Sequence, residues 1–326
     1  MIHEGSSGDG HGSSESKEDD VRLEVDGLVT EQHRPELAEI DRMPTRALLR
    51  VMNEEDERIP VAIAAVLDDI CAIVEMVAEH LGQGGRLVYV GAGTSGRLGV
   101  IDAAECVPTF NVPPDEVLGV MAGGDRAFAR SVEGVEDDVQ AGASDVAALE
   151  IQAPDVVVGI TASGRTPYVV GALTHARDRG AATAAVSCNH GSQVSGIADR
   201  SVEVVVGPEI VSGSTRLKAG TAQKMVLSMI STATMVRLGK TYGNLMVDVH
   251  ATNDKLRRRA QRIVEIATGR DEDESARALS TAGGDAKTAI LVLLTGESVE
   301  GARRLLERHG GVIRSALEGS SAEDAE

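Results

Sequence analysis

The sequence predicts an α/β protein with a doubly wound, mainly parallel sheet, covered by helices on both faces and followed by a small C-terminal three-helix module. Short apolar runs alternate with helical stretches, which is the βαβ rhythm of a parallel sheet. The chain of 326 residues has only two Phe, three Tyr and no Trp. Its core must therefore be aliphatic, as in a parallel sheet buried on both faces. The expected strands cover 86–90, 117–121, 155–160, 182–187 and 202–206.

The first strand leads into a glycine-rich turn. The letters GAGTSG at 91–96 follow the strand at once, and an apolar-periodic run predicts a helix over 98–104. Backbone N–H groups at such a helix start point outward, and the helix dipole favours negative charge there. Glu105 is expected at the end of this helix, about three turns away. An anion cradle followed by a carboxylate suits chemistry on a phosphorylated substrate.

The same turn matches G-x-G-x-x-G, the fingerprint of dinucleotide-binding proteins. That fingerprint needs an acidic residue about 20 residues further on, at the tip of the next strand, to hold the ribose. The next strand, 117–121, runs into Ala122 and two glycines and has no acid at its tip. Thr94 and Ser95 add donors that a dinucleotide turn does not need. A phosphate or sugar-phosphate site is therefore favoured over NAD binding and over a purely structural turn.

The third expected strand ends in a similar turn. The letters ASGRTP at 162–167 follow it, with Pro167 near the first position of a helix, where its missing N–H costs nothing. Two such turns at the carboxyl ends of two strands would flank one crevice of an open α/β sheet. Ordinary turn chemistry is the alternative. The repeated pattern favours the crevice.

A third polar cluster precedes the long apolar helix expected over 219–238. It consists of Glu209, Ser212, Ser214, Thr215, Arg216 and Lys218. Donors at a helix start make another anion site, and Ser214 or Thr215 is expected to cap this helix. A capping loop with surface cations is the alternative.

Charge and composition argue against several classes of function. The chain carries 51 acidic and 32 basic residues, a net charge of −19, which argues against binding to nucleic acid or to an anionic membrane surface. No apolar run approaches the length of about 18 residues that spans a membrane, and no signal peptide is visible. Cys71, Cys106 and Cys188 show no C-x-x-C spacing, so reduced thiols in a cytoplasmic protein are expected. No His/Cys/Asp cluster predicts a metal site.

The N-terminal part divides into a polar tail and a helical segment. Residues 1–20 have almost no apolar side chains and are expected to be disordered. One helix is expected from Thr45 through Asn53, and another from Pro60 to near Leu81. These helices precede the first strand and are candidates for packing against a second subunit. They are counted with the catalytic domain, which is expected over 21–240.

The C-terminal part is expected to be helical. A helical region should cover 241–318, followed by a frayed acidic tail at 319–326. Within 271–317, three short amphipathic helices are expected, split by glycines. These glycines are Gly283-Gly284, Gly296 and Gly310-Gly311.

Longer stretches of the chain resemble one enzyme family. The chain resembles the N-acetylmuramic acid 6-phosphate etherases, which have the sugar isomerase (SIS) fold, over roughly residues 28–317. Val107 and His190 stand where that family is expected to have proline. The matching segments are AEIDR at 38–42, GRLVYVGAGTSGRLGVIDAAEC at 85–106, SVEGVEDD at 131–138, DVVVGITASGRTPYV at 155–169, VVGPEIVSGSTRLKAGTAQKMVL at 205–227 and YGNLMVDVHATNDKLRRRA at 242–260.

The resemblance implies a lyase that removes the lactyl ether from a sugar phosphate by acid/base chemistry. Glu105 and Glu136 match the two functional glutamates of the family, although the acidic run 133–138 alone would suggest a solvated helix start. We expect Glu105 to protonate the departing lactate and Glu136 to be the second acid/base group. No metal or cofactor is required. Substrate contacts are expected from Gly93, Thr94, Ser95, Ser163, Gly164, Arg165, Thr166, Glu209, Ser214 and Lys218.

The resemblance also implies a homodimer and a C-terminal module of the kind found in ubiquitin-associated domains. Two other functions remain open. One is a non-catalytic, sugar-phosphate-binding regulatory protein, which would need neither glutamate. The other is an aldose–ketose isomerase, which shares ring opening and proton abstraction but expels nothing.

Overall fold

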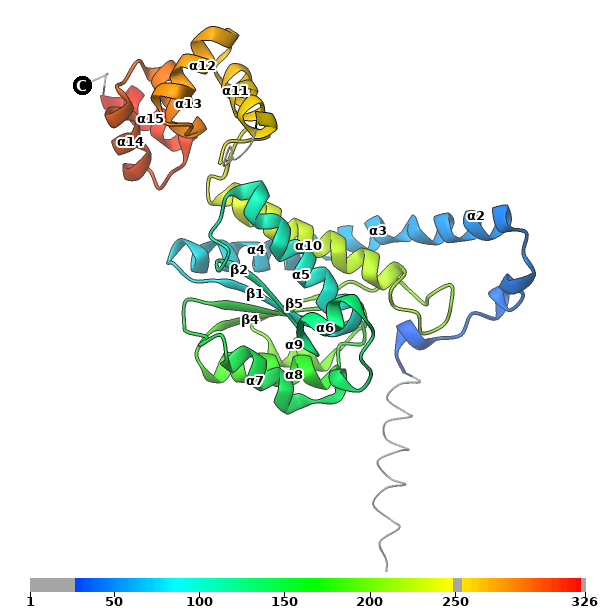
Figure 1. The fold of residues 1–326 in the computed structure, drawn as a ribbon. Coiled ribbons are helices and arrows are strands. Elements are labelled where there is room, and N and C mark those ends of the chain that lie inside the picture. The colour runs from blue at the N-terminus through cyan, green and yellow to red at the C-terminus, as the bar shows by residue number, and fades with distance from the viewer. Residues whose placement is uncertain (1–26, 249–253, 324–326) are drawn as a thin grey trace, which may run out of the picture.

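Five strands form one fully parallel sheet in the order β2-β1-β3-β4-β5 (Figure 1). The computed structural model describes residues 27–248 and 254–323, so the tail predicted at 1–20 lies outside the described residues. The doubly wound α/β fold is confirmed. The strands are β1 (Leu87–Gly91), β2 (Val117–Met121), β3 (Val156–Ile160), β4 (Ala182–Ser187) and β5 (Arg200–Glu203).

The last strand differs from its predicted bounds of 202–206. Val204 and Val206 are buried like strand residues, but the pairing between β4 and β5 ends at Ser187 and Glu203. The apolar pattern therefore continues beyond the last paired residues, where the N–H of Val204 still donates to the carbonyl of Ser187 at 2.9 Å.

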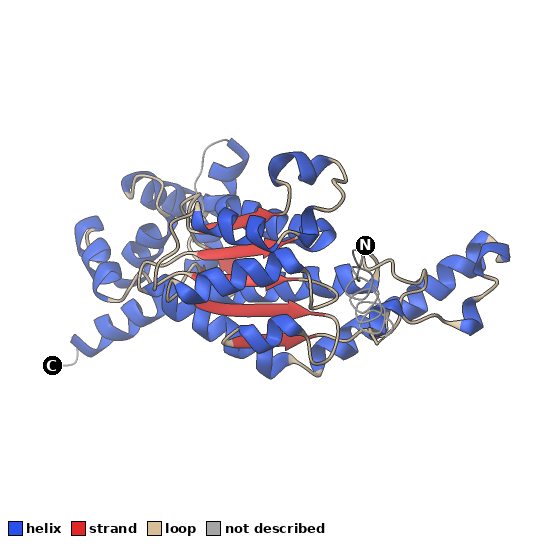
Figure 2. Ribbon diagram, turned by 90° about the horizontal axis from the view of Figure 1, so that it is seen from below, coloured by secondary structure: helices blue, strands red, loops and turns tan. Residues whose placement is uncertain are grey.

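Alternate side chains of the central strands enter two separate cores. On β1, Leu87 and Tyr89 belong to one core, whereas Val88 and Val90 belong to the other. This alternation follows from the two-residue period of a strand. The first core is covered by α4 (Leu67–Gly82), α5 (Gly93–Phe110) and α10 (Lys218–Arg237), and the second by α7 (Val139–Ala147), α8 (Pro167–Asp178) and α9 (Gln193–Ile197). Figure 2 shows the strands side by side with helices around them.

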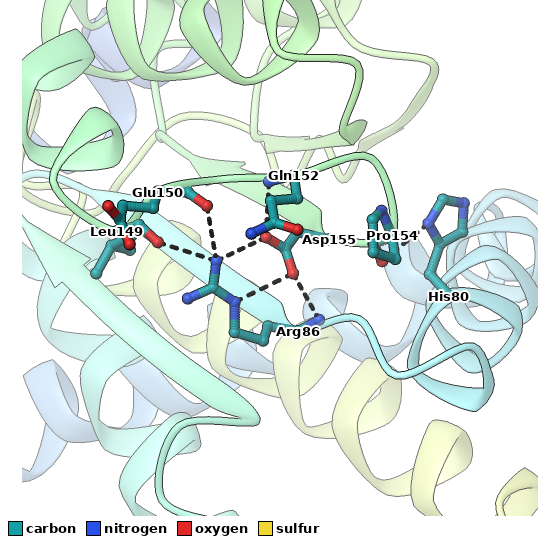
Figure 3. Close-up of polar contacts among 7 residues, drawn as sticks. All are labelled: His80, Arg86, Leu149, Glu150, Gln152, Pro154 and Asp155. Atoms are coloured by element: carbon teal, nitrogen blue, oxygen red, sulfur yellow. Dashed lines mark hydrogen bonds and ion pairs between the residues drawn. The ribbon is translucent and has the colours of Figure 1, made fainter.

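A buried ion pair joins the amino ends of β1 and β3 (Figure 3). Asp155 accepts hydrogen bonds from the backbone N–H, Nε and the terminal nitrogen of Arg86, at 2.9, 3.1 and 2.7 Å. Burial raises the pKa of Asp155, but these bonds and the N–H of Gln152 outweigh burial and hold it below its usual value. The same guanidinium donates to the carbonyl of Leu149. This pair fastens the two strands at the end of the sheet opposite the turns.

The N-terminal segment contains two helices that extend away from the sheet (Figures 1 and 2). Helix α2 (Thr45–Asp56) starts where predicted, but its N-cap is Pro44 and no side chain caps it. The helix predicted from Pro60 is broken into α3 (Arg58–Ala64) and α4, because Val66 leaves the helical region with ψ 20°. Short 3-10 turns precede α2 at Val29–Glu31, Pro35–Leu37 and Ile40–Arg42.

The helix after β1 is longer than predicted. Helix α5 starts at Gly93 and passes Pro108, so Thr94 and Ser95 lie in its first turn and Glu105 lies in its body. It ends where Asn111 adopts a left-handed conformation, with φ 51°. The sequence predicts the next helix over 127–132, whereas α6 spans Gly124–Ala129, and α7 was not predicted as a separate helix.

The C-terminal helices enclose a core of their own, which includes Val264, Ile290 and Leu305. The prediction of three helices over 271–317 is wrong, because three glycine breaks separate four helices. Gly296, for example, ends α13 with φ 78°. The last helix runs to Glu323, past the predicted start of the frayed tail. The elements are the hairpin β6 (Thr241–Tyr242) and β7 (Leu245–Met246), which was not predicted, then α11 (Asp254–Thr268), α12 (Glu272–Thr281), α13 (Ala286–Thr295), α14 (Val299–Arg308) and α15 (Ile313–Glu323).

None of the helices in the described residues is both long and apolar enough to cross a bilayer.

Candidate active site

A cleft of about 280 Å³ lies at the carboxyl ends of β1 and β3. The chain leaves β1 toward β2 on one side and returns as β3 on the other, so the strand order reverses between them. Open α/β sheets bind ligands at such a reversal. The lining includes Gly93, Thr94 and Ser95 from the first turn and Ser163 and Thr166 from the second. The two turns predicted to share a crevice therefore meet.

Helix α5 presents its N-terminus to this cleft. Its N-cap, Ala92, is extended and supplies no capping side chain, so its first N–H groups have no side-chain partner there. The turn requires glycine at position 96, because the backbone there lies close to the backbone of Gly91. A Cβ on Gly96 would lie 2.5 Å from the carbonyl oxygen of Gly91. The first turn of α5 can thus come directly under an anionic ligand.

Hydroxyl groups from the second turn form a network. Thr161 Oγ1 lies 2.6 Å from Thr166 Oγ1 and 3.3 Å from Ser163 Oγ. Ser163 Oγ also accepts a hydrogen bond from the backbone N–H of Arg165 at 3.2 Å. Gly164, at φ 76°, packs so closely that a Cβ would lie 2.2 Å from Ser192 Cβ. Gly164 and Arg165 therefore shape the turn without lining the cleft.

Three carboxylates and one guanidinium line the cleft within the described residues. The carboxylates are those of Glu31, Glu133 and Glu136, and the last sits in a 3-10 turn over Val135–Asp137. The guanidinium of Arg97 donates to the carbonyls of Ala127 and Phe128 at 2.7 and 3.0 Å, at the end of α6. Arg97 thus ties α5 to the segment that carries the acidic residues.

Charged side chains near the start of α10 form hydrogen bonds and ion pairs with other groups of the protein. Glu209, 1% exposed, accepts hydrogen bonds from the backbone N–H groups of Lys218 and Ala219 at 3.0 and 2.9 Å. It therefore occupies the capping role predicted for Ser214 or Thr215. Burial raises the pKa of Glu209 and prevails over these two bonds.

Lys218 also points into the protein. Its side chain is 1% exposed, and its Nζ lies 2.6 Å from Oε2 of Glu55 on α2, which Arg34 also contacts at 2.7 Å. Burial raises the pKa of Glu55, but the hydrogen bonds from Lys218 and Arg34 outweigh burial and lower it overall. Thr215 lines the cleft from this loop, whereas Glu209, Ser214 and Lys218 do not.

Glu105 lies away from the cleft of its own chain. It is exposed on α5, eleven residues after Thr94, which corresponds to about 16 Å along a helix. The two glutamates predicted to be catalytic are therefore not brought together within one chain.

Several lining residues were not predicted. Thr161 and Arg97 flank the two predicted turns, and Glu133 lies in the acidic run, so a wider reading of each motif would have included them. Glu31 has no such local signal, because it reaches the cleft from a segment that lies 62 residues before Gly93 in the sequence. No group of three or more His, Cys, Asp or Glu within 27–248 and 254–323 is arranged to hold a metal ion.

Two family models match parts of the chain. The family model described as SIS domain matches residues 133–233, and the model of the glucokinase regulatory protein N-terminal SIS domain matches residues 69–177. Among solved structures, a phosphoheptose isomerase from Francisella tularensis has a TM-score of 0.49 at 18% identity, covering 60% of this chain and 100% of that one.

Sequence relatives are much closer. The N-acetylmuramic acid 6-phosphate etherase of Streptomyces avermitilis is 55% identical over 297 residues, which cover 91% of this chain and 96% of the relative. The etherase of Rubrobacter xylanophilus is 57% identical over 290 residues, covering 89% and 96%. Because identity above one half extends over nearly the whole of each protein, the chain belongs to the N-acetylmuramic acid 6-phosphate etherase family.

Proposed function

We propose that this protein is a carbon–oxygen lyase that converts N-acetylmuramic acid 6-phosphate to N-acetylglucosamine 6-phosphate and D-lactate. The observation that carries the proposal is membership of the etherase family at 55% identity over 91% of the chain. The cleft supports it, because an open helix N-terminus and a set of hydroxyls suit a phosphorylated sugar. A cytoplasmic location is expected with this activity.

The reaction needs only proton transfers. Lactate leaves carbon 3 as an alkoxide, which is a poor leaving group unless an acid protonates it. The carbon-2 proton becomes acidic when ring opening turns carbon 1 into an aldehyde. A base takes that proton, the electrons form the carbon 2–carbon 3 double bond, and the carbon 3–oxygen bond breaks. Water then adds its oxygen to carbon 3, and a proton returns to carbon 2.

The cleft offers groups for both tasks. Thr94, Ser95, Ser163 and Thr166 would hold the phosphate or the sugar hydroxyls, together with the N–H groups of α5. Glu136 lines the same cleft and would act as one acid/base group. Two carboxylates in different environments can divide acid and base work between them.

We infer that the second carboxylate, Glu105, serves the cleft of a second copy in a homodimer. Its position on α5 keeps it from the cleft of its own chain, about 16 Å away along the helix. An apolar groove of about 820 Å³ between α4 and α10 supports the pairing of two copies. Its lining includes Leu67 and Val236, whose side chains are 49% and 48% exposed in the single chain. Packing of two copies along this face would bury that surface.

Release of free lactate from N-acetylmuramic acid 6-phosphate tests the activity. The purified protein should release lactate and sugar phosphate in equal amounts. Binding of the sugar phosphate without release would instead indicate a regulatory protein. Conversion of an aldose phosphate to a ketose phosphate without lactate would indicate an isomerase.

The route is tested in deuterated, oxygen-18-labelled water. Elimination followed by water addition puts solvent oxygen on carbon 3 and deuterium on carbon 2 of the product. Direct displacement at carbon 3 would leave the carbon-2 hydrogen in place. No label at either position would overturn the elimination route and the roles of both glutamates.

A further inference from the structure

A buried glutamine lies directly behind Ser95. Ser95 Oγ donates a hydrogen bond to Oε1 of Gln223 at 2.8 Å. Ser95 lines the cleft and is 6% exposed, whereas Gln223, on the inner face of α10, is 0% exposed. The first turns of α5 and α10 meet here, since a Cβ on Gly220 would lie 3.3 Å from Thr94 Cγ2. Gln223 therefore contacts the cleft through Ser95.

Only one of the two polar atoms in the side-chain amide of Gln223, Oε1, has a hydrogen-bond partner within the described part of the chain. Its buried Nε2 has no hydrogen-bond partner among the described residues. A buried amide N–H₂ without a partner is costly, and an aliphatic side chain would avoid that cost. An amide can turn by 180° about its terminal bond, which exchanges its acceptor for its donors at nearly the same positions. Gln223 can thus bind Ser95 either as acceptor or as donor.

The two orientations give Ser95 opposite properties toward a ligand. A serine hydroxyl has one proton. When Oε1 accepts that proton, Ser95 offers only lone pairs to the cleft, which repel an anionic oxygen. When Nε2 donates to Ser95 Oγ, Nε2 takes the partner that Oε1 gives up, and the single proton of Ser95 is free to point at the ligand.

We propose that Gln223 is a positioning residue that sets the direction of the Ser95 hydroxyl, turning Nε2 toward Ser95 when a phosphorylated sugar enters the cleft. Ser95 then donates its proton to an anionic oxygen of the ligand. This role rests on the proposed function, because it assigns Ser95 to the phosphorylated substrate. It extends that function to a residue that does not line the cleft.

The test replaces the amide by a group whose donor can be removed with pH. In Gln223→Glu, a protonated carboxyl can donate to Ser95, whereas a carboxylate can only accept. The KM of the variant relative to wild type should rise about tenfold or more between about pH 6 and pH 9, with kcat within about threefold, because one charge-assisted hydrogen bond to the ligand is lost. The matched control is Gln140→Glu, since Gln140 also bonds a serine, Ser144, but on the exposed surface of α7. Its KM ratio should stay flat.

A second background separates positioning from simple charge repulsion. In Ser95→Ala, the further change Gln223→Glu should have a much smaller pH-dependent effect on KM, because the hydroxyl that Gln223 directs is absent and only charge repulsion remains. A KM ratio that is flat in the wild-type background, or one that rises as steeply with pH in Ser95→Ala, overturns the proposal. If Gln223→Glu does not fold, the near-isosteric Gln223→Met replaces it. Its expected result is a severalfold rise in KM that disappears in Ser95→Ala, and equal effects in both backgrounds overturn the proposal.

Binding of inorganic phosphate keeps this test independent of the reaction. The Kd of phosphate should respond to the same variants in the same order as KM. Wild-type protein that releases no lactate, with a Kd that still follows this pattern, would overturn the lyase activity and leave the role of Gln223 in place. Lactate release with a Kd and a KM that do not change in the Gln223 variants would support the lyase activity and overturn the role of Gln223.

Discussion

The ion-pair network around Glu55 should stabilise the fold, and Glu55→Gln tests this. Glu55 is 7% exposed in its side chain and contacts Lys218 Nζ, Arg34 and Arg58. The change keeps the size of the side chain and removes its charge. It leaves the ammonium of Lys218, 1% exposed, with no carboxylate partner in the described structure at that position.

The expected magnitude follows from the burial of this pair. Removing one partner of a buried ion pair costs about 3–5 kcal/mol, and the lower end applies here because glutamine still accepts a hydrogen bond. About 3 kcal/mol corresponds to a fall in Tm of about 6–12 °C for a domain of 150–250 residues. The control Glu39→Gln breaks the pair between Glu39 and Arg42, whose side chains are 75% and 74% exposed, and should change Tm by no more than about 2 °C.

The effect should depend on pH with a definite sign. The folded-state pKa of Glu55 is lowered, so its contribution to stability is present above its unfolded pKa of about 4.5 and is lost as pH falls through the folded pKa. Calorimetry should therefore show the full Tm difference at neutral pH and convergence of wild type and variant in acid. Adding Lys218→Met to Glu55→Gln should recover part of the lost Tm, because it removes the unpaired cation.

A Tm for Glu55→Gln within the range of the Glu39→Gln control would refute this reasoning. So would a double variant no more stable than Glu55→Gln alone. Either result would remove the pair between Glu55 and Lys218 from the account of what stabilises the fold.

Four further predictions concern the site, the assembly and the stability of the fold. Glu105→Gln should abolish lactate release while changing sugar-phosphate affinity by less than about tenfold, since the phosphate cradle stays intact. Mixing inactive Glu105→Gln with inactive Glu136→Gln should restore activity if each site draws one glutamate from each copy, and mixed dimers without activity would contradict that sharing. Light scattering should give a dimer at micromolar concentration, and a monomer would count against it. Gly164→Ala should cost about 2–4 kcal/mol, because its Cβ would lie 2.2 Å from Ser192 Cβ, whereas Gly180→Ala at φ 80° meets nothing within 4 Å and should cost only about 1–2 kcal/mol.

Local sequence patterns were sufficient to predict the sheet and the two polar turns that follow β1 and β3, but not the polar segment before α10. A strand followed by GAGTSG or ASGRT identifies its own conformation, because glycine, hydroxyl side chains and Pro167 each restrict the backbone within a few residues. The parallel arrangement then brings the ends of β1 and β3 together whatever else surrounds them. The hydroxyl-lined cleft could therefore be predicted from the sequence.

Errors in the predicted elements also have local causes. The start of α5 was placed after the glycine turn, although small residues allow a helix to begin within it at Gly93. The C-terminal helices were counted as three although three glycine breaks imply four. In both cases glycine indicated a helix boundary, but it did not define where the adjacent helix begins or how many helices the boundaries separate.

Side chains that interact over long sequence distances were decided only by the tertiary structure. The residue types of Lys218 and Glu209 do not tell whether their side chains face a ligand or the protein interior. Lys218 has the partner Glu55 only because α2 lies against the start of α10 in the folded chain. The packing of α5 against α10 places Gln223 behind Ser95, 128 positions apart. The sequence by itself determined the backbone that forms the cleft, because backbone conformation depends on neighbouring residues. Which charged and polar groups face that cleft depends on how distant helices pack, and packing depends on the whole chain.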